Sequence, residues 1–502
     1  MFNELNFIIR NNHDEDGLTE ELINEIGRNY KIGKGIVYDA NPGVRCQVEG
    51  IDYRSVTAIS RHDCLELHKK CLALDGDILD AMLPYKSMAM HIMMRESHYD
   101  VYDRAYLEKV YYRHLRYWYT VIETNNINAI FYLVIPHHCG EYILYALSRV
   151  LDIPVVMLYP QISHDGILCF LGDSLESIGN NIGDIYEGLT DAGALNKYMS
   201  NVVDKIEKNT IMVSGKREDL LKDVYNMMHQ YVGVGSILKD SKMLMLIKLN
   251  IIKRVYKEDS INTYKRLIKL KYKIRKYLRK MDTIKTYREF SVMPQKKDRY
   301  LYFPLQTTPE ASTMPLAREF KEQLLGIEMI ADVAKKYNLF VYVKEHWSQL
   351  YRRPGFYKDL QQIENVKIID ENVNSIDLIE NSVAVVNMTG NCLFEALIKG
   401  KPAIAVGKGA TFKKAPHLIY VNNKKDVDYA LDNIINGKIV VKKEEMLKYC
   451  VAIQKGAVYS YVDRLSEASR YYVKEDTAHM IVEYFKQYSR GELRDANSIM
   501  GL

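Results

Sequence analysis

Val341–His346 reads VYVKEH, and Val385–Gly407 reads VVNMTGNCLFEALIKGKPAIAVG. In each stretch a short run of apolar and β-branched residues, which is typical of a buried strand, stops at polar residues. The first run ends in Lys-Glu-His, and the second ends in Met-Thr-Gly-Asn just before a helical pattern. Ligands of open α/β sheets bind at the carboxyl ends of the strands. Both groups of polar residues are therefore expected at one crevice.

Lys344 and His346 stand at the end of the first strand. Because side chains alternate along a strand, these two lie on the same face. An ammonium group and an imidazole that converge there suit a phosphate or the charge that develops on a leaving group, with His346 as donor or acid. The alternative is a surface Lys–Glu pair beside a hydrogen-bonded structural histidine.

The second strand end offers Thr389, Gly390, Asn391 and Glu395. Gly390 permits a tight turn, and Thr389 or Asn391 can cap the following helix, leaving free N–H groups that point into the crevice. Such a helix N-terminus favours an anion. Glu395 stands in the apolar run CLFEALI, where a carboxylate needs partners, and it could accept both hydroxyls of a ribose. An ordinary capped helix with a solvated Glu395 is the alternative.

A hydroxyl-rich loop, Pro304–Leu316, follows the predicted strand Tyr300–Phe303 and carries one carboxylate, Glu310. Loops at strand ends often carry ligand contacts, so Glu310 is a candidate binding residue. A plain connection explains the loop equally well.

The amino-terminal half has its own polar strand end, IPHHCGEYILY, at Ile135–Tyr145. His138 and Glu141 are candidate general bases there, and Asp165, after the next predicted strand, is a third. Two adjacent histidines cannot both face one metal from a regular strand, so no metal site is expected. Turn formation and helix capping are the alternative roles.

Strands and helices alternate in two separate parts of the chain, which predicts parallel sheets built from βαβ units. The expected fold is α/β, with two Rossmann-like domains that face each other across a cleft. The predicted limits are 1–194 for the first domain, 195–292 for a basic helical insertion, 293–438 for the second domain and 439–502 for a helical tail.

Composition places the chain among globular proteins, with 502 residues, 47% hydrophobic and 26% charged. No apolar run approaches the roughly 20 residues that span a bilayer, and the first residues lack the pattern of a secretory signal. Seven cysteines form no C-x-x-C pair, which favours reduced thiols over zinc or disulfides. A cytoplasmic location is expected, with peripheral attachment to a membrane as an addition.

The net charge of +5 is concentrated in residues 239–288, where seventeen Lys/Arg stand against four Asp/Glu. Apolar residues recur there at helical spacing. Such a helix could rest on an anionic membrane, hold a polyanionic acceptor, or be a solvated arm packed on the body. No zinc finger or aromatic RNP motif accompanies it, so nucleic acid is not an expected partner.

Together these residues resemble the bacterial capsule polysaccharide biosynthesis glycosyltransferases, a group that includes Kdo-transferase-like enzymes of the two-Rossmann (GT-B) type. YFPLQTTPEAST resembles the family's strand and Pro-Glu loop, VYVKEH its Lys-Glu-His-Pro motif, and TGN with FEALIKGKPAIAVG its nucleotide-binding helix and next strand. The likeness is clearest over about 300–407 and weaker in PHHCGEYILYALSRVLDIPVVML. Trp347 stands where the family has proline after the histidine.

The resemblance implies roles for the candidate residues. Lys344 and His346 would contact the donor phosphate, Thr389, Gly390 and Asn391 would cradle it, and Glu395 would hold the ribose.

The implied reaction moves a sugar from a nucleotide-activated donor, CMP- or UDP-linked, to a polysaccharide or lipid-linked acceptor. It would need no metal or other cofactor, because a lysine, a histidine and a helix N-terminus can stabilise the leaving phosphate. Three alternatives remain open: a CDP-alcohol-dependent polyol-phosphate transferase, a nucleotide-sugar epimerase, and a non-catalytic scaffold of a polysaccharide assembly complex.

Overall fold

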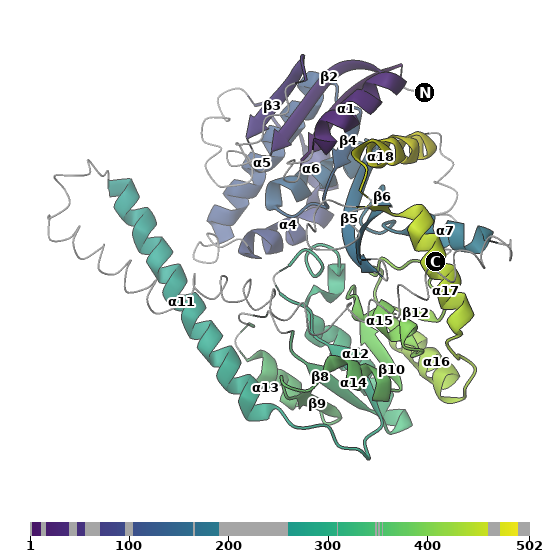
Figure 1. The fold of residues 1–502 in the computed structure, drawn as a ribbon. Helices are drawn as coiled ribbons and strands as arrows, with labels where there is room; N and C mark the ends of the chain where they lie inside the picture. The colour runs from purple at the N-terminus through teal and green to yellow at the C-terminus, as the bar shows by residue number, and fades with distance from the viewer. Residues whose placement is uncertain are drawn as a thin grey trace.

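The computed structural model describes residues 3–11, 17–39, 48–55, 71–95, 104–163, 166–189, 260–308, 310–346, 349, 352–353, 355–459 and 472–489. Within them the chain forms two α/β domains that pack against each other, and one long helix projects from the body (Figure 1). The expected α/β class with two parallel-sheet domains is confirmed.

The amino-terminal domain is built on a seven-stranded sheet in the order β13-β6-β5-β4-β1-β2-β3. Strands β1 to β5 are parallel, β6 is antiparallel to β5, and β13 is antiparallel to β6. Their bounds are β1 Glu4–Arg10, β2 Lys31–Asp39, β3 Ile51–Ser55, β4 Ala129–Tyr132, β5 Val155–Ser163, β6 Gly166–Gly172 and β13 Val458–Tyr459.

Helices cover both faces of this sheet, so its strands are buried on both sides, as parallel strands require. One face packs on α1 (Leu18–Asn29) and α18 (Lys474–Ser489). The other packs on α4 (Leu83–Arg95), α5 (Arg104–Asn125) and α6 (Cys139–Val150). The described chain adds α3 (Gly76–Ala81) before α4, and α7 (Asn180–Gly188) beside α17 (Lys443–Gly456).

The carboxy-terminal domain has a fully parallel six-stranded sheet in the order β12-β11-β10-β7-β8-β9. The bounds are β7 Tyr300–Pro304, β8 Phe340–Lys344, β9 Val366–Ile369, β10 Ala384–Asn387, β11 Ala403–Val406 and β12 Leu418–Val421. The chain moves outward from β7 to β9, then returns to the other side of β7 with β10. This reversal between β7 and β10 is the switch point at which doubly wound sheets bind ligands.

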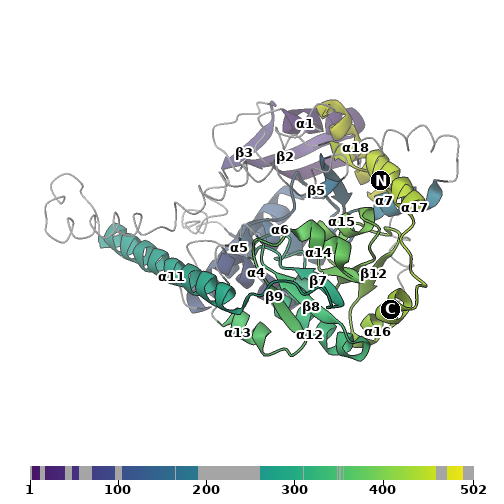
Figure 2. The same ribbon diagram turned by 60° about the horizontal axis from the view of Figure 1, so that its bottom comes forward.

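Helices are again divided between the two faces of the sheet. The face turned away from the amino-terminal domain packs on α12 (Gln323–Ala334), α13 (Phe356–Gln361) and α16 (Lys424–Ile435). The other face packs on α14 (Ser375–Asn381) and α15 (Cys392–Ile398), both shown between the sheet and the first domain in Figure 2. Two short 3₁₀ helices, Arg318–Lys321 and Lys335–Tyr337, flank α12.

The domains share a continuous apolar contact. The ring of Phe412 packs edge-on against Phe170 of β6, with centroids 5.6 Å apart, and stacks on Phe394 of α15 at 4.6 Å. At the margin, Lys414 Nζ lies 2.7 Å from carboxylate oxygens of both Asp184 and Glu187. Burying such rings at the junction fixes one domain against the other.

The tail belongs structurally to the first domain. Strand β13 extends the amino-terminal sheet, and α18 packs beside α1 on the same face of that sheet (Figure 1). The proposed limits of the tail and of the insertion stay predictions. Residues 195–259 of the insertion lie outside the described residues.

Helix α11 (Ser260–Phe290) is the described part of the basic insertion and projects from the carboxy-terminal domain in both views (Figures 1 and 2). Among the described residues, no helix combines the length and the hydropathy that crossing a membrane demands.

Candidate functional site

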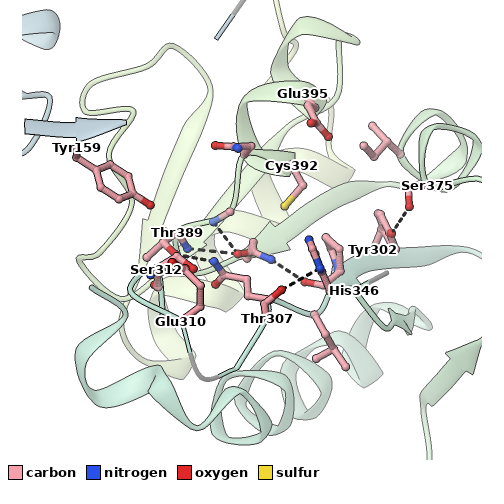
Figure 3. A pocket seen from close by; sticks show the side chains of 17 residues that line it. Tyr159, Tyr302, Thr307, Glu310, Ser312, His346, Ser375, Thr389, Cys392 and Glu395 are labelled. Carbon is pink, nitrogen blue, oxygen red and sulfur yellow. Dashed lines mark hydrogen bonds between the residues drawn. The ribbon is translucent and has the colours of Figure 1, made fainter. Parts of the chain in front are cut away.

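A cavity of about 420 Å³ lies at the carboxyl ends of β7, β8 and β10, at the switch point of the carboxy-terminal sheet (Figure 3). Its walls come from the loops after these strands, from α14 and α15, and from β5 of the other domain. The lining residues are Tyr159, Tyr302, Pro304, Leu305, Gln306, Thr307, Glu310, Ser312, His346, Ser375, Ile379, Asn387, Thr389, Gly390, Asn391, Cys392 and Glu395. Six of the candidates from the sequence are among them: His346, Glu310, Thr389, Gly390, Asn391 and Glu395.

His346 stands where the sequence predicts it, just beyond the end of β8. Its Nδ1 lies 2.9 Å from the hydroxyl of Thr307, on the loop after the neighbouring strand β7. Burial lowers the pKa of His346 to about 4. The nearby Glu345 charge favours the protonated imidazole, but it offsets only part of this lowering. The imidazole is therefore neutral at neutral pH, and it can donate one hydrogen bond while accepting another.

A buried ion pair holds the loop that carries His346. Glu345 accepts from Arg352, with Nε–Oε2 at 2.7 Å and Nη2–Oε1 at 2.5 Å, and also from the hydroxyl of Tyr357. The backbone N–H of His346 donates to the same carboxylate at 2.6 Å. Arg352 further donates to the carbonyl of Gln306 at 2.8 Å, which ties the ends of β7 and β8 together. Such a doubly bonded pair is costly to break.

Gln306 is another buried polar residue of the cavity wall, and 7% of its surface is exposed. Its Nε2 donates to the hydroxyl of Thr389 at 2.6 Å. Its Oε1 has no hydrogen-bond partner within the described part of the chain. A buried acceptor without a partner costs stability, so a donor from a bound molecule would satisfy it.

The turn after β10 is organised by Asn387. Its Oδ1 accepts from the backbone N–H of Gly390 at 2.8 Å and of Thr389 at 3.3 Å, and its Nδ2 donates to the carbonyl of Pro304 at 2.7 Å. A side chain at position 390 would place its Cβ 2.8 Å from Asn387 Oδ1, so this close approach requires glycine.

These contacts correct two expectations about this turn. The N–H groups of Thr389 and Gly390 do not point free into the crevice, because Asn387 accepts from both. Neither Thr389 nor Asn391 caps α15 with its side chain. The Thr389 hydroxyl donates instead to the carbonyl of Ser312 at 2.8 Å, and Asn391 Oδ1 accepts from Gln161 of the amino-terminal domain. Both side chains thus form hydrogen bonds with residues distant in the sequence instead of capping α15.

Lys344 lies behind the wall and does not line the cavity. Its Nζ donates to the hydroxyl of Ser375 at 3.1 Å, and Ser375 does line the cavity. The charge of the lysine adds slightly to the lowering of the His346 pKa that burial causes.

Glu395 and Cys392 face the cavity from α15 (Figure 3). Burial raises the pKa of the Cys392 thiol, and the Glu395 charge adds to the rise. A thiol in this state is a poor nucleophile. The charged side chains among the described lining residues are the two carboxylates, Glu310 and Glu395, so cationic charge reaches the cavity from the second layer, through Lys344.

Two candidate bases of the amino-terminal half, Glu141 and His138, are not among the described residues that line the cavity. Glu141, buried at 2% exposure, pairs with Arg10 at 2.9 Å and accepts from the backbone N–H groups of His137 and His138. Arginine and these N–H groups hold the pKa of Glu141 at about 2 despite its burial. Glu141 therefore caps α6 and is a poor base, which is a correction of the expected role.

His138 stands at the N-cap position of α6, and it is not among the residues that line the cavity. Asp165 lies outside the described residues, as does Trp347. The amino-terminal domain reaches the cavity instead through Tyr159 of β5, and it contacts the cavity wall through Gln161.

Sequence reasoning missed Gln306, Arg352, Asn387 and Tyr159. A signal existed for Asn387, since an asparagine at a strand end, just before a turn with glycine, is typical of an Asx turn. The other three depend on which strands become neighbours, which local patterns do not reveal.

Residues 244–415, about a third of the chain, match the family described as capsule polysaccharide biosynthesis protein. The match includes β7, β8, β10, α15 and every cavity residue of the carboxy-terminal domain. The family resemblance noted in the sequence is thereby confirmed.

Solved structures give more distant likenesses. The UDP-GlcNAc 2-epimerase of Methanocaldococcus jannaschii is 11% identical over 90% of this chain and 99% of its own, with a TM-score of 0.24. The β-Kdo 2,7 transferase and β-Kdo 2,4 transferase of KpsC from Thermosulfurimonas dismutans are 14% and 11% identical. They cover 73% and 64% of this chain and 88% and 79% of their own, with TM-scores of 0.29 and 0.30. At such values these likenesses assign no function. A search of curated proteins gives no match.

Proposed function

We propose that this chain is a glycosyltransferase of the GT-B type that acts in capsule polysaccharide biosynthesis. It would bind a nucleotide-activated sugar in the cavity after β7, β8 and β10 and transfer the sugar to a polysaccharide or lipid-linked acceptor. The observation that carries the proposal is the cavity itself, which opens at the switch point of a doubly wound sheet within the residues that match the family.

The wall residues support a ligand that carries hydroxyls and a phosphate. The orphan Oε1 of Gln306 calls for a donor such as a hydroxyl or a base N–H. The neutral His346 can donate to a phosphate oxygen, and Lys344 lies close behind it. Glu395 supplies acceptor oxygens for ribose hydroxyls. This set can stabilise a leaving phosphate without a metal ion, which completes the proposed metal-independent mechanism.

The binding test uses the purified full chain and a panel of CMP-, CDP-, UDP- and GDP-linked compounds, CDP-glycerol included. A compound that binds the folded chain at a hundred times its Kd adds about 2.7 kcal/mol to the free energy of unfolding, which raises Tm. Glu395→Ala should abolish that rise. The matched control is Glu364→Ala, whose side chain is 86% exposed in the same domain, and it should keep the rise.

Three results separate the readings. Transfer or hydrolysis of a nucleotide sugar supports the proposed enzyme, whereas turnover of CDP-glycerol alone supports the polyol-phosphate transferase. Absence of binding to every compound contradicts the proposal and favours a scaffold. If Glu395→Ala keeps the full rise in Tm, the ribose assignment is wrong.

We further propose that α11 rests on the anionic inner surface of the membrane near the acceptor. Eleven Lys/Arg and two Asp/Glu fall within its 31 residues. Ile274, Leu278 and Met281, spaced at i, i+4 and i+7 on one face, are 40%, 61% and 47% exposed. Basic side chains around an exposed apolar stripe suit the interface of an anionic bilayer.

A further inference from the structure

The cavity is completed by the amino-terminal domain at one end only. Of the described lining residues, Tyr159 alone comes from that domain, on strand β5. Figure 3 places Tyr159 beside the Glu310 and Ser312 side of the cavity, while Glu395, Ser375 and Tyr302 lie on the opposite side. The cavity therefore has two ends of different origin.

Strand β5 is held against the cavity wall two residues beyond Tyr159. Gln161, which is 2% exposed, donates from Nε2 to Asn391 and accepts at Oε1 from the hydroxyl of Thr411 at 2.9 Å. Because strand side chains alternate, Tyr159 and Gln161 face the same way. The two hydrogen bonds of the Gln161 side chain to loops of the carboxy-terminal domain thus fix the phenol of Tyr159 at the cavity.

The two ends offer different chemistry to a ligand. The far end is lined by Ser375 of α14 and Glu395 of α15, where Glu395 can take ribose hydroxyls. The near end offers the aromatic face and hydroxyl of Tyr159 and the carboxylate of Glu310. Burial raises the pKa of the phenol, and the charge of Glu310 adds to the rise. The aromatic ring can pack on the apolar face of a ligand group. The phenol hydroxyl and the carboxylate can form hydrogen bonds with hydroxyls of the same group.

Reaction geometry selects the occupant of the near end. The acceptor hydroxyl must reach the carbon that joins the transferred group to the phosphate. Among the described lining residues, those at the Glu395 end come from the carboxy-terminal domain, whereas a group beside Tyr159 borders both domains. We propose that Tyr159 and Glu310 form the subsite for the donor's glycosyl group, with the nucleoside at the Glu395 end. This inference rests on the proposed function, and it makes Tyr159 a specificity-determining residue.

The experiment compares two ligands that differ only in the glycosyl group. Binding of UDP and UDP-N-acetylglucosamine, CMP and CMP-N-acetylneuraminate, and GDP and GDP-mannose is measured by calorimetry on the full chain. With the pair that binds wild type, Tyr159→Ala should weaken the nucleotide sugar about tenfold and leave the bare nucleotide within about twofold. Tyr159→Phe, which keeps the ring, and Glu310→Gln should weaken the nucleotide sugar by about threefold or more, again selectively.

Tyr429→Phe is the control, because Tyr429 is 71% exposed and lies on α16, a helix that contributes none of the described lining residues. It should change neither affinity. Tm without ligand shows whether Tyr159→Ala folds, and Tyr159→Phe and Glu310→Gln carry the test where it does not. Equal loss for both ligands, or no loss for either, overturns the glycosyl subsite alone. Failure of wild type to bind any nucleotide overturns the proposed function and the subsite with it.

Discussion

At the scale of single residues, the site depends on polar side chains that are buried and paired. Glu345 and Arg352 fix the turn that carries His346, and Asn387 fixes the turn that carries Gly390. Both turns sit at the end of a buried strand, so their geometry is set by the sheet and not by solvent. A ligand then meets side chains that are already oriented, which lowers the entropy cost of binding.

His346 should make folding sensitive to acid. Its folded pKa of about 4 lies below the usual value of 6.5, so between these values the unfolded chain binds a proton that the folded chain does not. Stability should therefore fall as pH drops from 6.5 toward 4, and His346→Asn should flatten this part of the Tm–pH curve.

The control for this measurement is His91→Asn, since His91 lies on α4 far from the cavity and bonds to the carbonyl of Ser87. Its curve should follow wild type. A His346→Asn curve with the wild-type slope between pH 6.5 and 4 would show that His346 is not held neutral by burial.

At the scale of elements, α11 differs from the other helices because it leaves the body and exposes an apolar stripe (Figure 2). Its last turns contact the body, where Tyr287 donates to the carbonyl of Ile369 and Arg288 pairs with Glu371 at 2.9 Å. A projecting helix can lie on a surface while the cavity faces the acceptor.

Binding to lipid vesicles tests the role of α11. Wild type should bind phosphatidylglycerol vesicles, with affinity falling as salt rises, and should bind phosphatidylcholine vesicles weakly. Each basic residue near the surface contributes about 1 kcal/mol, so Arg275→Gln with Arg279→Gln should weaken binding by about thirtyfold. Leu278→Glu should also reduce binding.

The matched control is Leu83→Glu, because Leu83 is 58% exposed on α4 of the other domain. It should bind vesicles like wild type. Equal binding by the α11 variants and wild type would leave α11 as a solvated arm.

At the scale of the whole molecule, the last helix completes the first domain. Ala478, Ile481, Val482 and Phe485 of α18 are at most 1% exposed against the amino-terminal sheet. Phe485 packs on Phe131 of β4 and on Tyr30, with ring centroids 5.3 and 5.9 Å away. In the sequence, the carboxy-terminal sheet therefore lies between two segments of the chain that together form the amino-terminal domain.

Phe485→Ala should therefore destabilise the amino-terminal domain although it lies near the other end of the chain. Removing a buried phenylalanine costs about 3–5 kcal/mol. Urea denaturation, followed by a signal from the amino-terminal domain, should show that loss. Val473→Ala, at a position 44% exposed, should change the free energy of unfolding by less than about 0.5 kcal/mol. A small change for both variants would show that the tail is only loosely attached.

The sequence by itself determined the α/β class and much of the carboxy-terminal site. Strand β7 and the ends of β8 and β10 lie where the residue patterns predict them, because apolar period and turn residues are local signals. For the same reason His346, Gly390 and Glu395 could be placed at strand ends facing one crevice.

Only the tertiary structure decided which elements became neighbours. The β5–β6 hairpin, β12 and β13 were not predicted, since a short strand is defined by its partner and not by its own residues. The strand order brought Gln306 and Arg352 to His346, and the packing of the domains brought Tyr159 and Gln161 to the cavity. These contacts join residues far apart in the chain, so their free energy depends on the topology as a whole, which no local window of sequence contains.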